Sequence, residues 1–274
     1  YSGINKISAD LAEIFLKTII STKKYPLTRL GSTNATEMAK VLENSYRAMN
    51  IAFAVEWSRF SEESGVNFYE LVDAIRMRPT HKNLMYPGIG VGGYCLTKDP
   101  LLASWSRQNL FKGDEELGQS IKGVMINDKM PLYAFEYMKR ELGDYKMKGK
   151  KALLLGVSYR SNVGDTRYSP VEPFYNYLIN EGVKIQLHDP YVRLWDELNI
   201  EVENNIEKVF ESDFNIIAVT TAHQEYKDSD CLLNLLLNQD DLFILDTVGL
   251  FSNSEIKRLR KKHKIRVVGR GDII

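Results

Sequence analysis

A cysteine stands among glycines and charged residues in the segment GVGGYCLTKDP. Cys95 follows Gly92 and Gly93, which lack side chains and therefore let a ligand approach the backbone closely. Lys98 and Asp99 come three and four residues later, just before a segment that reads as the start of a helix. A nearby cation and a helix N-terminus favour the thiolate, which is the nucleophilic form of cysteine. The segment therefore predicts a reactive cysteine, and the alternative is a buried structural cysteine in a tight turn.

The second cysteine, Cys231, lies among leucines in CLLNLLL and is predicted to be a small core residue. Two cysteines in such different contexts make no disulfide framework and have no metal-ligand spacing, so no metal site is expected. A cysteine hydrolase would need a histidine to partner Cys95. None of the four histidines has a persuasive position: one precedes the cysteine loop, two end C-terminal strands and one lies in a basic run (His81, His188, His223 and His263).

Two further polar pairs lie outside this loop. Lys40 and Asn44, in KVLENSYRAMNIAFAVEW, are four residues apart and share one face of a predicted helix. A cation and an amide there can hold an oxyanion or a water molecule, although such a pair on a helix is commonly a solvated face. Arg160 and Arg167, in GVSYRSNVGDTRYSP, lie in a strand-to-helix loop. Arginines in such a loop suit diphosphate recognition, and surface salt bridges are the alternative.

The elements that carry these residues change in kind along the chain. Apolar residues recur at helical spacing over 8–20, starting from Ser8 or Asp10, and over 32–64, 68–77 and 100–142. On the helix at 32–64, apolar residues cover more of the surface than the single stripe that one-sided packing needs. The additional apolar face predicts contact with a partner subunit. A basic, glycine-containing link at 146–151 then marks a domain boundary.

Beyond the link, short apolar strands alternate with helical segments. The strands are ALLLGVS, VKIQLHD, NIIAVT and LFILDT, with a helix around 171–180 after the first. This alternation is typical of a parallel sheet with crossover helices, and polar residues end each strand, where ligands bind in such sheets. The predicted fold class is therefore α/β: an all-helical region followed by a Rossmann-like parallel sheet that is a nucleotide-binding candidate.

Composition limits the class of partner. The 274 residues are 44 % hydrophobic, enough for two ordinary domains, and 36 basic residues balance 36 acidic ones. No excess charge favours nucleic acid or an anionic membrane surface. The apolar runs have strand length, so no membrane segment is expected. The few cysteines and the lack of a signal-peptide pattern favour a reducing, cytoplasmic setting.

The long helix, the cysteine loop and the arginine-containing loop follow one another along the chain in an order that resembles the UDP-glucose/GDP-mannose dehydrogenase family. TNATEMAKVLENSYRAMNIAFAVEW is similar to the family's central dimerisation helix, PGIGVGGYCLTKDP to its catalytic cysteine loop, and GVSYRSNVGDTRYSP with HDPYV to its UDP-binding domain. The resemblance covers essentially the whole chain. It implies three parts: residues 1–31 from the end of an NAD-binding domain, a helical central domain at 32–147, and a UDP-sugar-binding domain at 148–274.

The resemblance also implies a reaction. NAD would take four electrons from the C6 alcohol of a nucleotide sugar, in two steps, to give the uronate. Cys95 would be the nucleophile, Lys40 and Asn44 would hold the oxyanion and the catalytic water, and Asp99 would act as a base or orient water. The remaining site residues would approach NAD (Lys98 and Arg167) or contact the nucleotide sugar (Tyr159, Arg160, Gly92, Gly93 and Arg78).

The family's NAD-binding domain, with its glycine-rich turn and its catalytic glutamate and threonine, has no counterpart in this sequence. The glycines at 88–93 follow Pro87 rather than a strand, so they make a weak phosphate loop. The chain alone is therefore expected to be inactive, and a non-catalytic, nucleotide-sugar-binding and dimerisation module is the alternative. A homodimer through the helix at 32–64 is expected. The substrate stays open among UDP-glucose, UDP-N-acetylhexosamines and GDP-mannose, with HKNLMYPG more similar to the N-acetylhexosamine branch.

Overall fold

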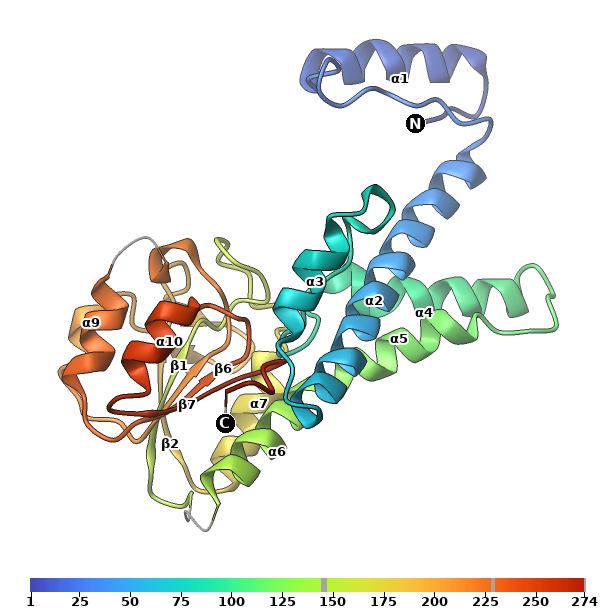
Figure 1. Ribbon diagram of the computed structural model, residues 1–274. Coiled ribbons are helices and arrows are strands. Elements are labelled where there is room, and N and C mark those ends of the chain that lie inside the picture. Colours follow the sequence, from blue (N-terminus) through green and yellow to red (C-terminus); the bar gives the residue numbers. More distant parts are fainter. Residues whose placement is uncertain (144–146, 228–229, 274) are drawn as a thin grey trace.

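A helical part leads into a parallel β-sheet covered by helices, as Figure 1 shows. The computed structural model describes residues 1–143, 147–227 and 230–273. The predicted α/β class, with a helical region before a Rossmann-like sheet, is confirmed. Among these described residues, no helix is both long and apolar enough to cross a membrane.

Helix α1 (Lys6–Ile19) stands apart from the other elements in Figure 1. The predicted start at Ser8 or Asp10 is wrong. Asn5 caps the helix instead, because its side chain accepts the Ser8 N–H at 2.9 Å and the Ser8 side chain accepts the Asn5 N–H in return. The apolar face of α1 is exposed, with five side chains between 62 % and 72 % accessible (Ile7, Leu11, Ile14, Phe15 and Ile19).

Helix α2 (Thr33–Glu63) is the long helix that the sequence predicts at 32–64. Ser32 caps its start by accepting the Ala35 N–H, and Gly65, with φ of 72°, ends it. It packs against α4 (Tyr94–Asn109) and α5 (Gly118–Asp128). The approach to α5 is close, since a Cβ on Gly123 would lie 3.2 Å from the Cα of Met49.

The segment after α2 departs from prediction in two places. Helices α3 (Phe68–Arg76) and η1 (Pro79–His81) come before a loop, and α4 then begins at Tyr94, not at Pro100. Gly93, with φ of 78°, turns the chain into the helix six residues early, so Pro100 lies inside α4. The single helical region predicted at 100–142 is three helices, α4, α5 and α6 (Met130–Leu142), separated at 110–117 and at Lys129.

The sheet contains five parallel strands in the order β2-β1-β5-β6-β7. Four of them match the predicted strands: β1 (Lys151–Leu155), β2 (Lys184–His188), β5 (Ile216–Val219) and β6 (Phe243–Asp246). The sequence did not predict β7 (Lys264–Val267) or the small antiparallel pair of β3 (Leu194–Trp195) and β4 (Ile200–Glu201). The predicted link at 146–151 leads into β1, and its residue Lys146 lies outside the described residues.

Helices cover both faces of the sheet, which explains why its three central strands, β1, β5 and β6, are mostly apolar. Leu154 and Ala218 face α6 and α7 (Val171–Asn180), whereas Leu153 and Ile217 face α9 (Cys231–Asn238) and α10 (Asn253–Leu259). The short helices α8 (Ile206–Val209) and η2 (Gln224–Tyr226) complete the second layer. Strand order reverses between β1 and β5, so the loops that follow these two strands flank the crevice where such sheets bind ligands.

Candidate active site

Residues of α2 and α4 meet at the buried carboxylate of Asp99. Asn44 Nδ2 donates a hydrogen bond to Asp99 Oδ2 at 2.6 Å, and Lys98 Nζ donates to Asp99 Oδ1 at 2.8 Å. Asn44 is 1 % exposed and Asp99 8 %, so their hydrogen bond is buried in the interface between α2 and α4. The structure therefore joins three of the predicted site residues, which lie up to 55 positions apart in the sequence.

Asp99 is ionised at neutral pH. Burial alone raises its pKa, but the hydrogen bonds from Lys98 and Asn44, together with the charge of Lys40, outweigh burial and hold the pKa below its usual value. Lys40 lies one turn before Asn44 on α2, is exposed, and pairs with Glu43 at 2.9 Å. Because α2 is helical over both positions, Lys40 and Asn44 lie on one face of it. Asn44 Nδ2 carries two hydrogens and gives one to Asp99, which leaves one donor for a ligand.

Cys95 occupies the first turn of α4 and is exposed to solvent. The unpaired N–H groups of a helix N-terminus favour an anion at this place. Lys98, one turn further along α4, lies within electrostatic range of the cysteine, and its hydrogen bond to Asp99 raises its own pKa. The thiol thus stands at a positive helix end, beside a lysine that a buried carboxylate holds in place.

The cysteine loop contacts the sheet domain through its glycines. Gly93 N–H donates to the Arg167 carbonyl oxygen at 3.1 Å. A Cβ on Gly93 would lie 2.8 Å from Tyr159 Cε2, and one on Gly92 would lie 2.5 Å from Tyr159 Cβ. These distances are too short for a side chain, so both glycines are needed to let the Tyr159 loop pack against the cysteine loop.

Two tyrosines that the sequence did not single out border this contact. The rings of Tyr94 and Tyr168 lie 5.7 Å apart, and Lys98 Nζ lies 4.9 Å from the centre of the Tyr94 ring. Beside them is a cavity of ≈ 510 Å³. Its lining includes Tyr94, Tyr168 and Lys98 together with Asn127. Tyr94 and Tyr168 each sit next to a predicted site residue, and that adjacency was the available signal.

Arg167 is exposed, and its guanidinium forms two hydrogen bonds with Asp165, at 2.9 Å and 2.7 Å. This pairing raises the pKa of Arg167, which stays charged. Lys98 lies over the Tyr94 ring, and Arg167 directly precedes Tyr168 in the chain. Two exposed cations around an aromatic surface fit the anionic diphosphate of a dinucleotide.

The remaining predicted substrate residues are less tightly placed. Arg160 is exposed in the loop after β1, next to Tyr159, and its carbonyl oxygen accepts a hydrogen bond from Ser158 Oγ at 3.3 Å. Arg78 is exposed at the start of η1. Within the part of the chain that the structure describes, no hydrogen bond or ion pair joins the Arg78 side chain to the cysteine group, so its role stays a prediction.

The histidines are engaged elsewhere. Both ring nitrogens of His188 bond, to the Tyr226 hydroxyl and the Asn204 carbonyl oxygen, and those of His263 bond to backbone groups. His223 is fully buried within the sheet domain, and His81 bonds to the adjacent Thr80. None of these contacts leaves a histidine paired with Cys95, which removes the basis for a cysteine hydrolase.

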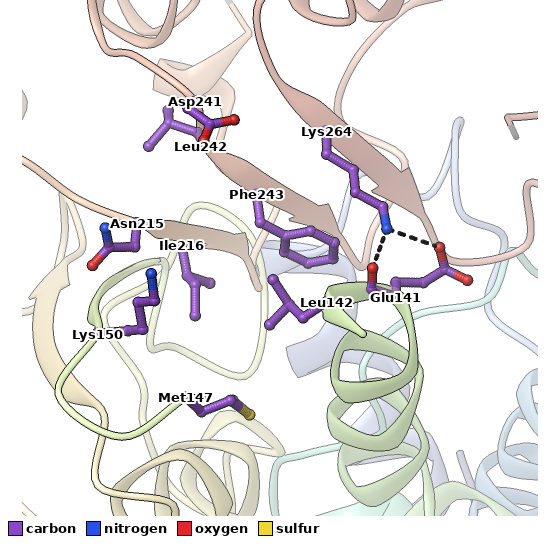
Figure 2. Close-up of a pocket in the computed structure, with 10 residues that line it drawn as sticks. All are labelled: Glu141, Leu142, Met147, Lys150, Asn215, Ile216, Asp241, Leu242, Phe243 and Lys264. Carbon is purple, nitrogen blue, oxygen red and sulfur yellow. Dashed lines mark hydrogen bonds and ion pairs between the residues drawn. The ribbon is translucent and has the colours of Figure 1, made fainter. Parts of the chain in front are cut away.

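A second, smaller cavity lies at the opposite edge of the sheet. It has a volume of ≈ 190 Å³. Figure 2 shows Leu142, Ile216 and Phe243 among its lining residues, together with the ion pair of Lys264 with Glu141. Its walls come from the amino ends of β5, β6 and β7, whereas the cysteine loop contacts the loop that follows the carboxyl end of β1. This cavity therefore takes no part in the site.

Residues 34–116 match the central domain of the UDP-glucose/GDP-mannose dehydrogenase family, and residues 153–253 match its UDP binding domain. The fold and both matches define a nucleotide-sugar dehydrogenase framework. The chain belongs to the UDP-glucose/GDP-mannose dehydrogenase family.

Individual relatives agree with this placement. The UDP-N-acetyl-D-mannosamine dehydrogenase of Methanocaldococcus jannaschii is 32 % identical over 273 residues, which cover 98 % of this chain and 58 % of the relative. The solved UDP-D-ManNAc dehydrogenase of Pyrococcus horikoshii superposes with a TM-score of 0.77 at 29 % identity, over 99 % of this chain and 60 % of that one. A dehydrogenase from Methanosarcina mazei, named for NDP-N-acetyl-D-galactosaminuronic acid, shares the fold with a TM-score of 0.82 at 24 % identity, over 99 % and 58 %. The chain thus spans about three fifths of the length of these relatives.

Proposed function

We propose that the full-length protein oxidises the C6 alcohol of a nucleotide sugar to the carboxylate, with NAD as the electron acceptor. The observation that carries the proposal is the exposed Cys95 at the N-terminus of α4, beside the Asn44–Asp99–Lys98 group, in a chain of this family. UDP-N-acetyl-D-mannosamine is the first substrate to test, because the similar curated proteins carry its name.

Cys95 gives the second oxidation a covalent path. Its sulfur adds to the carbon of the aldehyde intermediate and forms a thiohemiacetal, whose oxyanion Lys40 and the free N–H of Asn44 stabilise. When bound, NAD accepts one hydride in each of the two oxidations. Cys95 then holds the product as a thioester, and water hydrolyses it to the uronate and the free thiol. The hydrogen bonds from Lys98 and Asn44 hold the pKa of Asp99 below its usual value and make it a weak base, so Asp99 suits orienting Asn44 and the water better than removing a proton.

The binding residues divide between the two ligands. Lys98 and Arg167, the two cations beside the Tyr94–Tyr168 pair, would hold the diphosphate of NAD. Tyr159 and Arg160, in the loop after β1, would contact the nucleotide sugar. The same assignment covers three residues outside that loop: Gly92, Gly93 and Arg78.

A homodimer through α2 belongs to the same proposal. Six large apolar residues of α2 are between 47 % and 68 % exposed (Met38, Leu42, Tyr46, Phe53, Trp57 and Phe60). The Trp57 ring lies between Phe53 and Phe60, with ring centres 5.9 Å and 6.0 Å apart in tilted and edge-to-face arrangements, so part of this row is a continuous aromatic surface. A row of this size fits an interface better than solvent.

Turnover of the full-length protein with a panel of nucleotide sugars tests the proposal. UDP-N-acetyl-D-mannosamine, UDP-N-acetylglucosamine, UDP-glucose and GDP-mannose are each incubated with NAD, and NADH and product are quantified. The proposal expects two NADH per uronate for one of them. We expect the 274-residue chain alone to bind but not to oxidise. Binding without NAD reduction by the full-length protein would support the non-catalytic module instead.

A further inference from the structure

A buried polar cluster lies at the switch point of the sheet, where β1 and β5 end. Its members are Ser158 after β1, Asp189 after β2 and His223 after β5, and each is at most 1 % exposed. Groups this deeply buried are costly unless their hydrogen bonds are satisfied. The arrangement of those bonds shows what the cluster holds.

Asp189 fixes the hydrogen on one side of the His223 ring. Its Oδ2 lies 3.1 Å from His223 Nε2 and also accepts the N–H groups of Val157 and Ser158, at 2.8 Å and 3.1 Å. Burial raises the pKa of Asp189, but the bond from His223 and the backbone N–H groups outweigh it and hold the pKa below its usual value. A carboxylate can only accept, so Nε2 carries the hydrogen and Nδ1 keeps a lone pair.

That lone pair accepts the backbone N–H of Asn162 at 3.0 Å. Asn162 has a left-handed φ of 62°, and its side-chain oxygen accepts the N–H of Gln224 at 2.8 Å. Two bonds from the segment after β5 therefore hold one residue of the loop after β1. The His223 ring cannot turn freely, because Tyr191 and Tyr226 lie against it at 5.2 Å and 5.5 Å between ring centres.

The tethered loop carries Tyr159 and Arg160 and packs on the cysteine loop through Gly92 and Gly93. We infer that His223 is a positioning residue for nucleotide-sugar binding: its Nδ1 holds the Asn162 amide and so sets the Tyr159–Arg160 loop. The inference rests on the proposed function, since it requires that this loop bind the nucleotide.

A serine hydrolase triad is excluded by the same geometry. Ser158 Oγ lies 3.1 Å from His223 Nε2, but both atoms converge on the same oxygen, Asp189 Oδ2. In a triad the aspartate and the serine bind opposite ring nitrogens. Here the second nitrogen accepts the Asn162 N–H, so the ring has no aspartate and serine on opposite nitrogens.

Two conservative variants separate the two bonds of the ring. His223→Gln places an amide N–H where Nε2–H bonds Asp189, but it has no acceptor for Asn162. His223→Asn places an amide oxygen near Nδ1 and keeps that acceptor. We expect His223→Gln to raise the UDP dissociation constant of the 274-residue chain, and the nucleotide-sugar KM of the full-length protein, roughly tenfold, with kcat and the NAD KM unchanged. His223→Asn should stay within about threefold of the wild type.

Calorimetric titration with UDP and steady-state kinetics give these values, and amide hydrogen exchange of Asn162 in the wild type needs no variant. The Asn162 amide should be protected although its residue is exposed. Rapid exchange of the Asn162 amide would overturn the role of His223. So would equal UDP dissociation constants and KM values in the two variants, or a fall in kcat without a change in KM. Failure of the wild-type chain to bind millimolar UDP would instead overturn the assignment of the loop, and with it the proposed binding site.

Discussion

Replacing Asn44 with alanine should loosen the α2–α4 interface that carries the site. The change removes the 2.6 Å hydrogen bond to Asp99 and leaves a buried, ionised oxygen without that donor. Hydrogen bonds to charged groups contribute about 1.5–3 kcal/mol, and the loss should fall in this range. For a chain of this size the expected decrease in Tm is about 3–12 °C.

Lys40→Ala is the matched control on the same face of the helix. Lys40 pairs with Glu43 in solvent, where such pairs contribute about 0–1 kcal/mol, so its removal should leave Tm nearly unchanged. Both variants should lower turnover of the full-length protein if Lys40 and Asn44 stabilise the oxyanion. Only Asn44→Ala should also lower stability.

Asn44→Asp adds a test in pH. The new carboxyl would stand against Asp99, and two adjacent carboxylates cannot both ionise cheaply, so the pair takes up a proton with a pKa above its unfolded value. The shared proton therefore stabilises the folded variant at low pH, and this stabilisation is lost as pH rises. Thermal unfolding of the three variants at pH 5 and pH 8 measures this. An Asn44→Ala variant within about 0.5 kcal/mol of the wild type would refute the structural role of the bond.

Three further outcomes are expected. Iodoacetamide should modify the exposed Cys95 faster than the half-buried Cys231, with nucleotide sugar protecting Cys95, as peptide mass spectrometry of the full-length protein would show. Burial lowers the pKa of His263, so the unfolded chain takes up the proton first and the free energy of unfolding falls as pH drops below about 6.5. In urea unfolding, His263→Gln should make the free energy of unfolding depend less on pH. The same pH dependence in the variant and the wild type would count against this role of His263. Leu42→Lys should reduce self-association in sedimentation, whereas Ile179→Lys on α7 should not; a wild type that is monomeric at all concentrations would exclude the α2 dimer.

The sequence predicted elements whose ends depend on residues within or next to the element itself. The bounds of α2 follow from a serine cap at Ser32 and a left-handed glycine at Gly65, both within one turn of the helix. Three of the four strands predicted for the sheet, β1, β5 and β6, are mostly apolar runs, because helices cover both faces. Strand β7, KIRV, lies at the edge of the sheet and carries two cations, so its pattern resembles a surface segment.

Long-range contacts decided what the sequence did not reveal. Helix α4 begins at Tyr94 because Gly93 adopts a positive φ against Tyr159, a residue 66 positions later. The sequence placed Lys40, Asn44, Cys95 and Asp99 as candidates, but only the packing of α2 on α4 brings Asn44 to Asp99. His223 was visible only as a polar residue after a strand, since its partners Asp189 and Asn162 lie 34 and 61 positions away.

The nucleophilic role of Cys95 is the centre of the account, and intact mass spectrometry of full-length Cys95→Ser protein tests it most directly. The variant is incubated with UDP-N-acetyl-D-mannosamine and NAD, beside the wild type, and uronate is quantified in the same samples. A serine ester hydrolyses far more slowly than a thioester, so the account predicts blocked turnover in a folded variant and a sugar-acyl adduct that maps to residue 95. Uronate production near the wild-type level by Cys95→Ser, without an adduct, would contradict it.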